Sequence, residues 1–121
     1  SLTPEELEYF RNLLRAMLEE AQRKGDSTLE ELTDGEAAFA DPADRATAES
    51  DRSFTLRIRD RERRLIHKIQ EAIKRMDDGV YGVCEECGED IGVARLKARP
   101  VTTLCVSCKA RQEEGEDVRG N

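Results

Sequence analysis

The sequence predicts a mainly α-helical protein, in which a long antiparallel helical hairpin, or coiled coil, is followed by a small four-cysteine module that ends in a short C-terminal helix. Composition is the first observation: of 121 residues, 37% are hydrophobic, 4% are aromatic and 39% are charged, which is typical of long amphipathic helices. Apolar residues recur every three or four positions through the first two thirds of the chain. Four cysteines then form two close pairs in the last third.

Charge is unevenly spread over two expected domains, a hairpin over residues 1–78 with an acidic tip at 41–46, and a cysteine module over 79–121. The formal net charge is −7 at pH 7. Residues 1–50 carry thirteen acidic and five basic side chains, whereas residues 51–78 carry six and nine. An acidic first half repels nucleic-acid phosphate, which argues against nonspecific binding to duplex DNA.

The first helix begins with a capping box, since Thr3 is followed by Pro4 at the first helical position and by Glu6 at the third. Its apolar positions have the spacing of a coiled-coil seam: Leu7, Phe10, Leu14, Met17, Ala21, Leu29 and Leu32. Gly25 and Gly35 each weaken a helix by about 1 kcal/mol relative to alanine. We therefore expect one long helix with a weak point near these glycines.

A second helix is expected from about Ala43 to Met76, because Asp41-Pro42 forms a turn before it and Gly79 can supply a left-handed cap after it. Its predicted seam is Ile58, Leu65, Ile69, Ala72 and Met76, with Phe54, Ile66 and Ile73 beside it. Two amphipathic helices of similar length, joined by a short loop, should fold back on one another as an antiparallel hairpin. The single histidine, His67, is interpreted as an ordinary residue of this helix.

The cysteines have the spacing of a tetrahedral zinc site. Cys84 and Cys87 form one C-x-x-C pair, Cys105 and Cys108 form the other, and seventeen residues separate the pairs. Disulfides or a redox pair are the competing interpretation. A cytosolic setting disfavours disulfides, and a single redox motif would not need a second C-x-x-C pair. Four thiolates leave no coordination position for an activated water, so the zinc, one ion per chain, would fold this C4 zinc-finger module without performing chemistry. A last helix should begin at residue 105 or 106 and fray from residue 115.

The predicted turn carries two carboxylates, Asp41 and Asp44. One interpretation is ordinary capping of the second helix by either aspartate, and the residue types alone favour it. The other interpretation is a functional role, and it depends on the position of the two carboxylates. On a small loop at the far end of a long hairpin, they could enter a narrow opening.

Three motifs are distinctive in combination. They are Asp41-Pro42-Ala43-Asp44-Arg45-Ala46, which fits the pattern D-x-x-D-x-A; the basic block around Arg59-Asp60-Arg61-Glu62-Arg63; and the cysteine module with Tyr81-Gly82, Ile91-Gly92 and the run from Arg95 to Pro100. Together they resemble the DksA/TraR family of bacterial C4-type zinc-finger proteins, over nearly the whole chain. The resemblance implies a non-enzymatic transcription factor that enters the secondary channel of RNA polymerase and binds no promoter sequence. With the nucleotide ppGpp it would repress ribosomal RNA promoters and aid some amino-acid biosynthesis promoters.

The resemblance also implies roles for individual residues. Asp41, Asp44 and Ala46 would act at the tip, and the family's ppGpp contacts match Lys68, Arg99 and Lys109, with Leu65 and Arg95 beside them. A nucleotide with several phosphates needs several cations, although the residue types alone fit solvated surface charges better. The basic block over residues 57–64 fits an ion-paired solvent face and a contact with an acidic channel rim equally well.

Two other functions remain open. A transcript-cleavage factor would use the acidic tip to hold a catalytic Mg²⁺. A zinc-ribbon nucleic-acid binder would need the basic balance and the aromatic stacking face that this composition lacks. No apolar run approaches the 18 or so residues of a membrane span, and no secretory leader is recognisable, so we expect a cytoplasmic protein. We also expect the protein to be a monomer.

Overall fold

The computed structural model describes residues 2–36 and 42–120, with side chains for residues 2–26 and 50–115. Helices dominate, and no β-strand occurs within the two described ranges. The mainly helical fold class is therefore confirmed.

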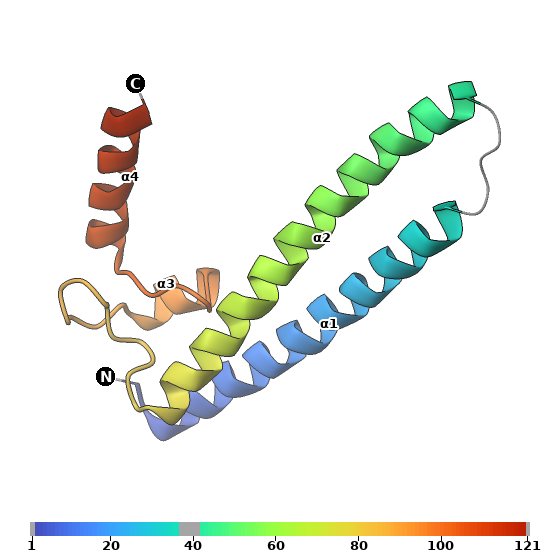
Figure 1. The fold of residues 1–121 in the computed structure, drawn as a ribbon. Coiled ribbons are helices and arrows are strands. Elements are labelled where there is room, and N and C mark those ends of the chain that lie inside the picture. The colour runs from blue at the N-terminus through green and yellow to red at the C-terminus, as the bar shows by residue number, and fades with distance from the viewer. Residues whose placement is uncertain (1, 37–41, 121) are drawn as a thin grey trace. The chain divides into compact units, whose positions relative to one another are not determined.

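The chain forms two compact units. The first unit is Ser1–Arg15 with Ile69–Asn121, and the second unit is Ala16–Lys68. In each unit, a segment of the first long helix lies beside a segment of the second long helix that runs in the opposite direction (Figure 1). This pairing is the antiparallel hairpin expected from the two seams. The domain boundary expected after residue 78 stays a prediction.

The first long helix, α1, spans Pro4–Glu36 and begins as the sequence predicts. The backbone N–H of Thr3 donates to Glu6 Oε1 at 2.9 Å, and the N–H of Glu6 donates to Thr3 Oγ1 at 3.1 Å, so both halves of the capping box form. The helix continues through Gly25 and Gly35 without a break. A single long helix results because packing of an apolar face supplies more free energy than two glycines cost.

The second long helix, α2, spans Pro42–Asp77, one residue longer at each end than predicted. Gly79 ends it with a φ of 76°. The N–H of Gly79 donates to the carbonyl of Met76 at 3.1 Å, and the N–H of Val80 donates to the carbonyl of Arg75 at 2.9 Å. These two bonds are a Schellman cap, in which a left-handed glycine lets the last carbonyls of the helix find donors.

The seam of α2 differs from the prediction at two positions. Phe54 and Leu65 are 59% and 38% exposed, whereas the other predicted seam residues are buried or partly buried. At about 100° per residue, Glu62 lies nearer to the middle of the buried stripe than either of them. Glu62 Oε2 is 3.9 Å from the place that a Cβ on Gly25 would take. The prediction failed at these two positions because the buried face of α2 includes the polar residue Glu62. Phe54 and Leu65 therefore lie on the flank of that face.

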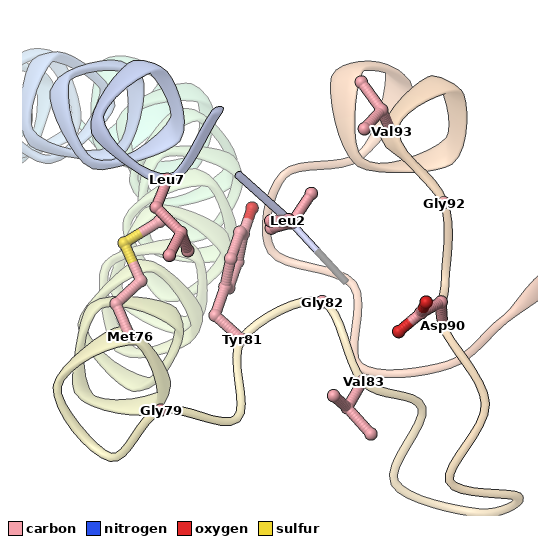
Figure 2. Close-up of a pocket in the computed structure, with 10 residues that line it drawn as sticks. All are labelled: Leu2, Leu7, Met76, Gly79, Tyr81, Gly82, Val83, Asp90, Gly92 and Val93. Carbon is pink, nitrogen blue, oxygen red and sulfur yellow. The ribbon is translucent and has the colours of Figure 1, made fainter. Parts of the chain in front are cut away.

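The core of the first unit joins the long helices to the cysteine module. Its buried residues include Phe10, Leu14, Ile69, Ala72, Met76, Tyr81, Ile91 and Leu96. The rings of Phe10 and Tyr81 are 5.8 Å apart between centroids, and the Tyr81 hydroxyl donates to the carbonyl of Pro100 at 2.8 Å. A cavity of about 190 Å³ lies beside this tyrosine, with Leu2 next to its ring (Figure 2).

Two short helices complete the first unit. The sequence did not predict α3, Val93–Ala98, which follows Gly92 and has no side-chain cap. α4, Val106–Gly120, begins where the sequence predicts but continues past residue 115, so the expected fraying is not seen in its backbone. Between α2 and α3, one antiparallel bridge joins Val83 and Asp90. Within the described part of the chain, no helix is long and apolar enough to cross a membrane.

Candidate metal centre

The first cysteine pair lies in a tight turn after α2. The N–H of Cys84 donates to the carbonyl of Glu89 at 2.8 Å, and the N–H of Gly88 donates back to the carbonyl of Cys84 at 3.0 Å. Gly88 has a φ of 75°, a conformation that costs glycine nothing and strains other residues. The turn therefore holds the side chains of Cys84 and Cys87 on one side of the loop.

The second cysteine pair is positioned by the start of α4. Cys105 directly precedes the helix, and its carbonyl accepts the N–H of Lys109 at 2.9 Å. Cys108 lies in the first helical turn and is 4% exposed. One backbone hydrogen bond connects the two loops that carry the cysteine pairs, since the N–H of Glu85 donates to the carbonyl of Thr103 at 2.9 Å.

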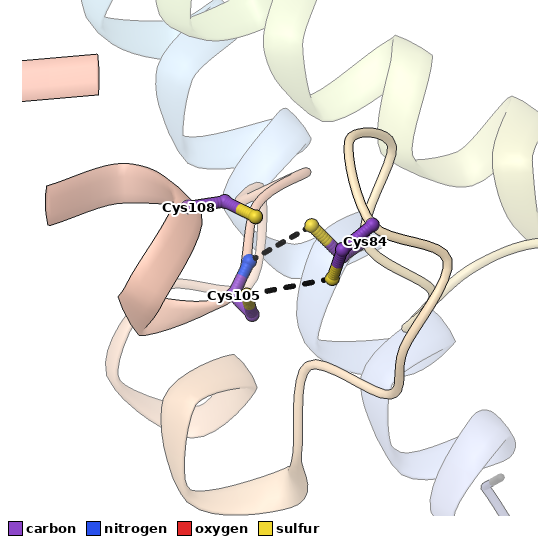
Figure 3. Close-up of side chains that lie close together, drawn as sticks. Cys84, Cys105 and Cys108 are labelled. Atoms are coloured by element: carbon purple, nitrogen blue, oxygen red, sulfur yellow. Dashed lines mark hydrogen bonds between the residues drawn. The ribbon is translucent and has the colours of Figure 1, made fainter. Parts of the chain in front are cut away.

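The four sulfurs converge on one point. All four Sγ atoms lie within 4.8 Å of one another, and none of the cysteines is in a disulfide. Figure 3 shows Cys84, Cys105 and Cys108 directed toward one another from the loop and the start of α4. The Sγ atoms of Cys87 and Cys105 are 3.8 Å apart, and four sulfurs at about 2.3 Å from a zinc ion form a tetrahedron with edges of about 3.8 Å. The residues fit a structural C4 zinc site, as predicted, and a disulfide interpretation does not fit.

The cysteine environments differ electrostatically. Backbone N–H groups, first that of Cys87, lower the pKa of Cys84 to about 6, and the N–H of Cys105 donates to Cys84 Sγ at 3.3 Å. Burial raises the pKa of Cys108 to about 12 when no metal is bound. Since zinc binds thiolates, loading this centre releases protons and favours the deprotonated form of the buried sulfur.

An arginine of α2 fixes the loop that carries the first pair. Arg75 is 15% exposed, and its Nη1 donates to Glu85 Oε1 at 2.9 Å. Its Nη2 donates to the carbonyls of Val83 at 2.6 Å and Val80 at 3.3 Å. One guanidinium thus satisfies three acceptors of the segment 80–85, which contains Cys84. The sequence carried no signal for this role of Arg75.

The residues predicted to bind ppGpp fall into both units. Leu65 and Lys68 are exposed residues of α2 in the second unit. Arg95, Arg99 and Lys109 belong to the first unit. Nε and Nη2 of Arg95 are buried and have no hydrogen-bond partner among the described residues, whereas Lys109 Nζ donates to Gln112 Oε1 at 3.0 Å. Buried side-chain nitrogens without an acceptor are uncommon in proteins, and an ordered water or an ion can satisfy them.

The predicted tip is only partly described. Asp41 lies outside the described residues, and Asp44 and Ala46 lie in the first turns of α2 with side chains outside the described set. Their roles stay predictions. The basic block is described: Arg57, Arg61, Arg63 and Arg64 are exposed on α2. Both interpretations of that block therefore remain compatible with its position.

The sequence interpretation also missed a contact at the metal centre. Arg111 Nη2 donates to Cys108 Sγ at 3.0 Å, and the two residues are separated by three positions in α4. Residues three apart are neighbours on a helix surface. That spacing could have predicted the contact once the helix start was known.

Comparison with known proteins covers both parts of the chain. Residues 6–76 match the family described as DnaK suppressor protein DksA, N-terminal domain, and residues 79–114 match the prokaryotic dksA/traR C4-type zinc finger. A Caulobacter vibrioides protein named RNA polymerase-binding transcription factor DksA is 49% identical over 113 residues, which are 93% of this chain and 80% of that protein. The Escherichia coli K12 protein of the same name is 44% identical over 108 residues, covering 89% of this chain and 72% of that protein.

A solved structure agrees with these matches. Transcription factor DksA2 from Pseudomonas aeruginosa superposes with a TM-score of 0.87 at 41% identity, covering 94% of this chain and 88% of that one. At this identity and coverage, the fold of this chain is similar to the fold of that structure over most of both chains. This chain belongs to the DksA/TraR family of C4-type zinc-finger proteins.

Proposed function

We propose that this protein binds RNA polymerase directly and regulates transcription without performing catalysis. One observation carries the proposal: relatives named RNA polymerase-binding transcription factor DksA are 44% to 49% identical to this chain over about nine tenths of its length. The composition supports a protein partner rather than DNA, because the net charge is −7 and no tryptophan is present. The protein would act as a monomer in the cytoplasm, where the polymerase works.

A flank of α2 is suited to contact such a partner. Phe54, Arg61, Leu65 and Lys68 are exposed, and the helical repeat places them within about 60° of one another around the helix axis. A stripe that mixes apolar and cationic groups is typical of protein-binding surfaces and fits an acidic rim on the partner. This flank would hold the helical pair in the secondary channel of the polymerase.

The acidic tip would supply the regulatory effect. Asp41, Asp44 and Ala46 match the tip pattern of the family, and α2 begins at Pro42 between the two aspartates. Carboxylates brought close to the catalytic Mg²⁺ and template would change the stability of the initiation complex through electrostatics. We propose repression of ribosomal RNA promoters and activation of some amino-acid biosynthesis promoters as the outcome.

The nucleotide ppGpp would act as the effector at the protein–polymerase contact. The buried, unpartnered Nε and Nη2 atoms of Arg95 support an anion site, since a guanidinium presents paired donors to phosphate oxygens. Arg99 and Lys109 in the same unit, and Leu65 and Lys68 in the other, complete the proposed set. Binding of labelled ppGpp to the polymerase, with and without this protein, tests the assignment.

The substitution Asp44→Asn tests the tip. It removes one charge at nearly constant volume, so we expect unchanged affinity for core polymerase in a pull-down and loss of repression of a ribosomal RNA promoter in vitro. Asp51→Asn is the matched control, because Asp51 is an exposed carboxylate of α2 outside the tip, and it should repress normally.

Two outcomes would count against these assignments. Normal repression by Asp44→Asn would exclude the tip mechanism, while failure of the unaltered chain to bind polymerase would exclude the partner itself. Shortening of RNA in a backtracked elongation complex would instead identify a transcript-cleavage factor, whose tip carboxylates would hold a catalytic Mg²⁺.

A further inference from the structure

Arg111 makes an unusual contact at the edge of the metal centre. Its Nη2 donates to Cys108 Sγ at 3.0 Å from the next turn of α4. It is the one cationic side chain that bonds to a cysteine sulfur among the described hydrogen bonds. Lys109, two positions earlier, is directed to Gln112 instead.

The net negative charge of a C4 zinc centre can be compensated by the cationic side chain of Arg111. Four thiolates around Zn²⁺ carry two negative charges in excess of the metal. Cys84 and Cys108 are 2% and 4% exposed, so water supplies little compensation at these two sulfurs. Cys84 Sγ accepts the backbone N–H of Cys105 at 3.3 Å, and Cys108 Sγ accepts the guanidinium. Each buried sulfur thus has its own donor, and only the donor to Cys108 carries a full charge.

Arg111 also lines a hollow beside the sulfur cluster. Glu86, Cys87, Leu104, Cys108, Arg111 and Gln112 line a hollow of about 560 Å³. Of the two cysteines in this lining, Cys87 is exposed to water and small solutes, whereas Cys108 is buried. Arg111 is one of the residues that line this hollow, and its side chain bonds to the buried Cys108 there.

We propose that Arg111 is a positioning residue of the zinc centre, which compensates the charge of the Cys108 thiolate and thereby sets how tightly the metal is held. Partners that donate to metal ligands commonly change metal affinity by about 10- to 100-fold when they are removed. A guanidinium suits the task because it stays charged at every accessible pH. This inference concerns zinc retention and does not depend on the proposed function.

The experiment compares zinc affinity in three variants of the full chain, by competition with a chromogenic chelator. Arg111→Leu should lose roughly 10- to 100-fold in affinity. Arg111→Lys should lose less, since an ammonium keeps the charge but not the planar donor geometry. Lys74→Leu is the matched control, because Lys74 is an exposed cation of α2 in the same unit and its loss changes the net charge equally. It should bind zinc as the unaltered chain does.

A spectroscopic measurement separates the hydrogen bond from long-range charge. With Co²⁺ in place of zinc, a donor to sulfur lowers the energy of the sulfur lone pairs and raises the energy of the sulfur-to-cobalt charge-transfer band. This band should move to lower energy in Arg111→Leu and stay in place in Lys74→Leu. Circular dichroism of each loaded variant checks that α4 remains folded.

Three results would overturn the proposal. The first is zinc affinity of Arg111→Leu within about twofold of the unaltered chain, where a removed donor should cost at least tenfold. The second is an equal loss in Lys74→Leu, which would assign the effect to net charge. The third is an unchanged cobalt band in a folded Arg111→Leu, or in the neutral Arg111→Gln if the leucine variant does not fold.

Discussion

At the scale of single residues, Tyr81 connects the helices to the cysteine module. Its side chain packs against Phe10 and its hydroxyl donates to the carbonyl of Pro100, while only 6% of the residue is exposed. Burial raises the pKa of Tyr81 to about 12 from an ordinary value of 10.0. The tyrosinate is therefore much less favourable in the folded chain than in the unfolded chain.

This shift predicts a loss of stability at alkaline pH. Below pH 10 the hydroxyl is protonated in both states, so its contribution to folding is fully present. As the pH rises from 10 toward 12, the unfolded chain releases the proton first, and the free energy of unfolding should fall by up to about 2 kcal/mol. Urea unfolding across this range, compared with Tyr81→Phe, isolates the effect from the titration of lysines.

Tyr81→Phe should be less stable by about 1 kcal/mol at neutral pH, because it lacks the bond to Pro100. The difference between the two proteins should then shrink or reverse between pH 10 and 12. A difference that stays constant throughout this range would contradict the assigned burial of the hydroxyl.

At the scale of elements, two glycines show how context decides the effect of one residue type. Gly25 lies within α1 at an ordinary helical φ, and a Cβ there would come no closer than 3.9 Å to Glu62 Oε2. Gly79 caps α2 with a φ of 76°, although the space around it is open. Glycine is thus a cost in α1 and a requirement at the end of α2.

Alanine should therefore have opposite effects at the two positions. Gly25→Ala should raise the free energy of unfolding by about 0.5 to 1 kcal/mol, since it reduces the entropy of the unfolded chain and fits its surroundings. Gly79→Ala should lower it by about 1 kcal/mol, since an L-residue is strained at positive φ. Thermal and urea unfolding measure both. Destabilisation by Gly25→Ala would mean that the 180 Å³ hollow beside Gly25 requires its present shape.

Local patterns predicted the elements well and their contacts poorly. The capping box at Thr3, the cap at Gly79 and the cysteine ligands depend on neighbours in sequence, and each was found from spacing alone. The inward position of Glu62 depends on the partner helix, where Gly25 leaves room for it. No periodicity within α2 contains that information. For the same reason, the bonds of Arg75 to the cysteine loop could not be predicted from the helix that carries it.

At the scale of the whole molecule, the cysteine module has so few buried apolar side chains that its folding should depend on the bound metal. Beyond α2 the buried apolar side chains are few, chiefly Tyr81, Ile91 and Leu96. The loop around the first cysteine pair has one β-bridge, and α3 has only 6 residues. Such a segment cannot bury enough apolar surface to offset the entropy of ordering it. Four metal–sulfur bonds would supply the missing free energy.

Removal of zinc should therefore unfold the cysteine module selectively. Hydrogen exchange with mass spectrometry, before and after chelation, should show loss of protection in α3, in α4 and in the loop from residue 80. Peptides from Ala16–Lys68 should keep their protection, because that unit contains no cysteine and is held by helix pairing. Cys108→Ser should reproduce the chelated pattern without chelator, since three thiolates hold zinc less tightly than four. Retained protection of α4 in both samples would mean that the contacts of Leu96 and Tyr81 fold the module, and that the metal only tightens a structure already formed.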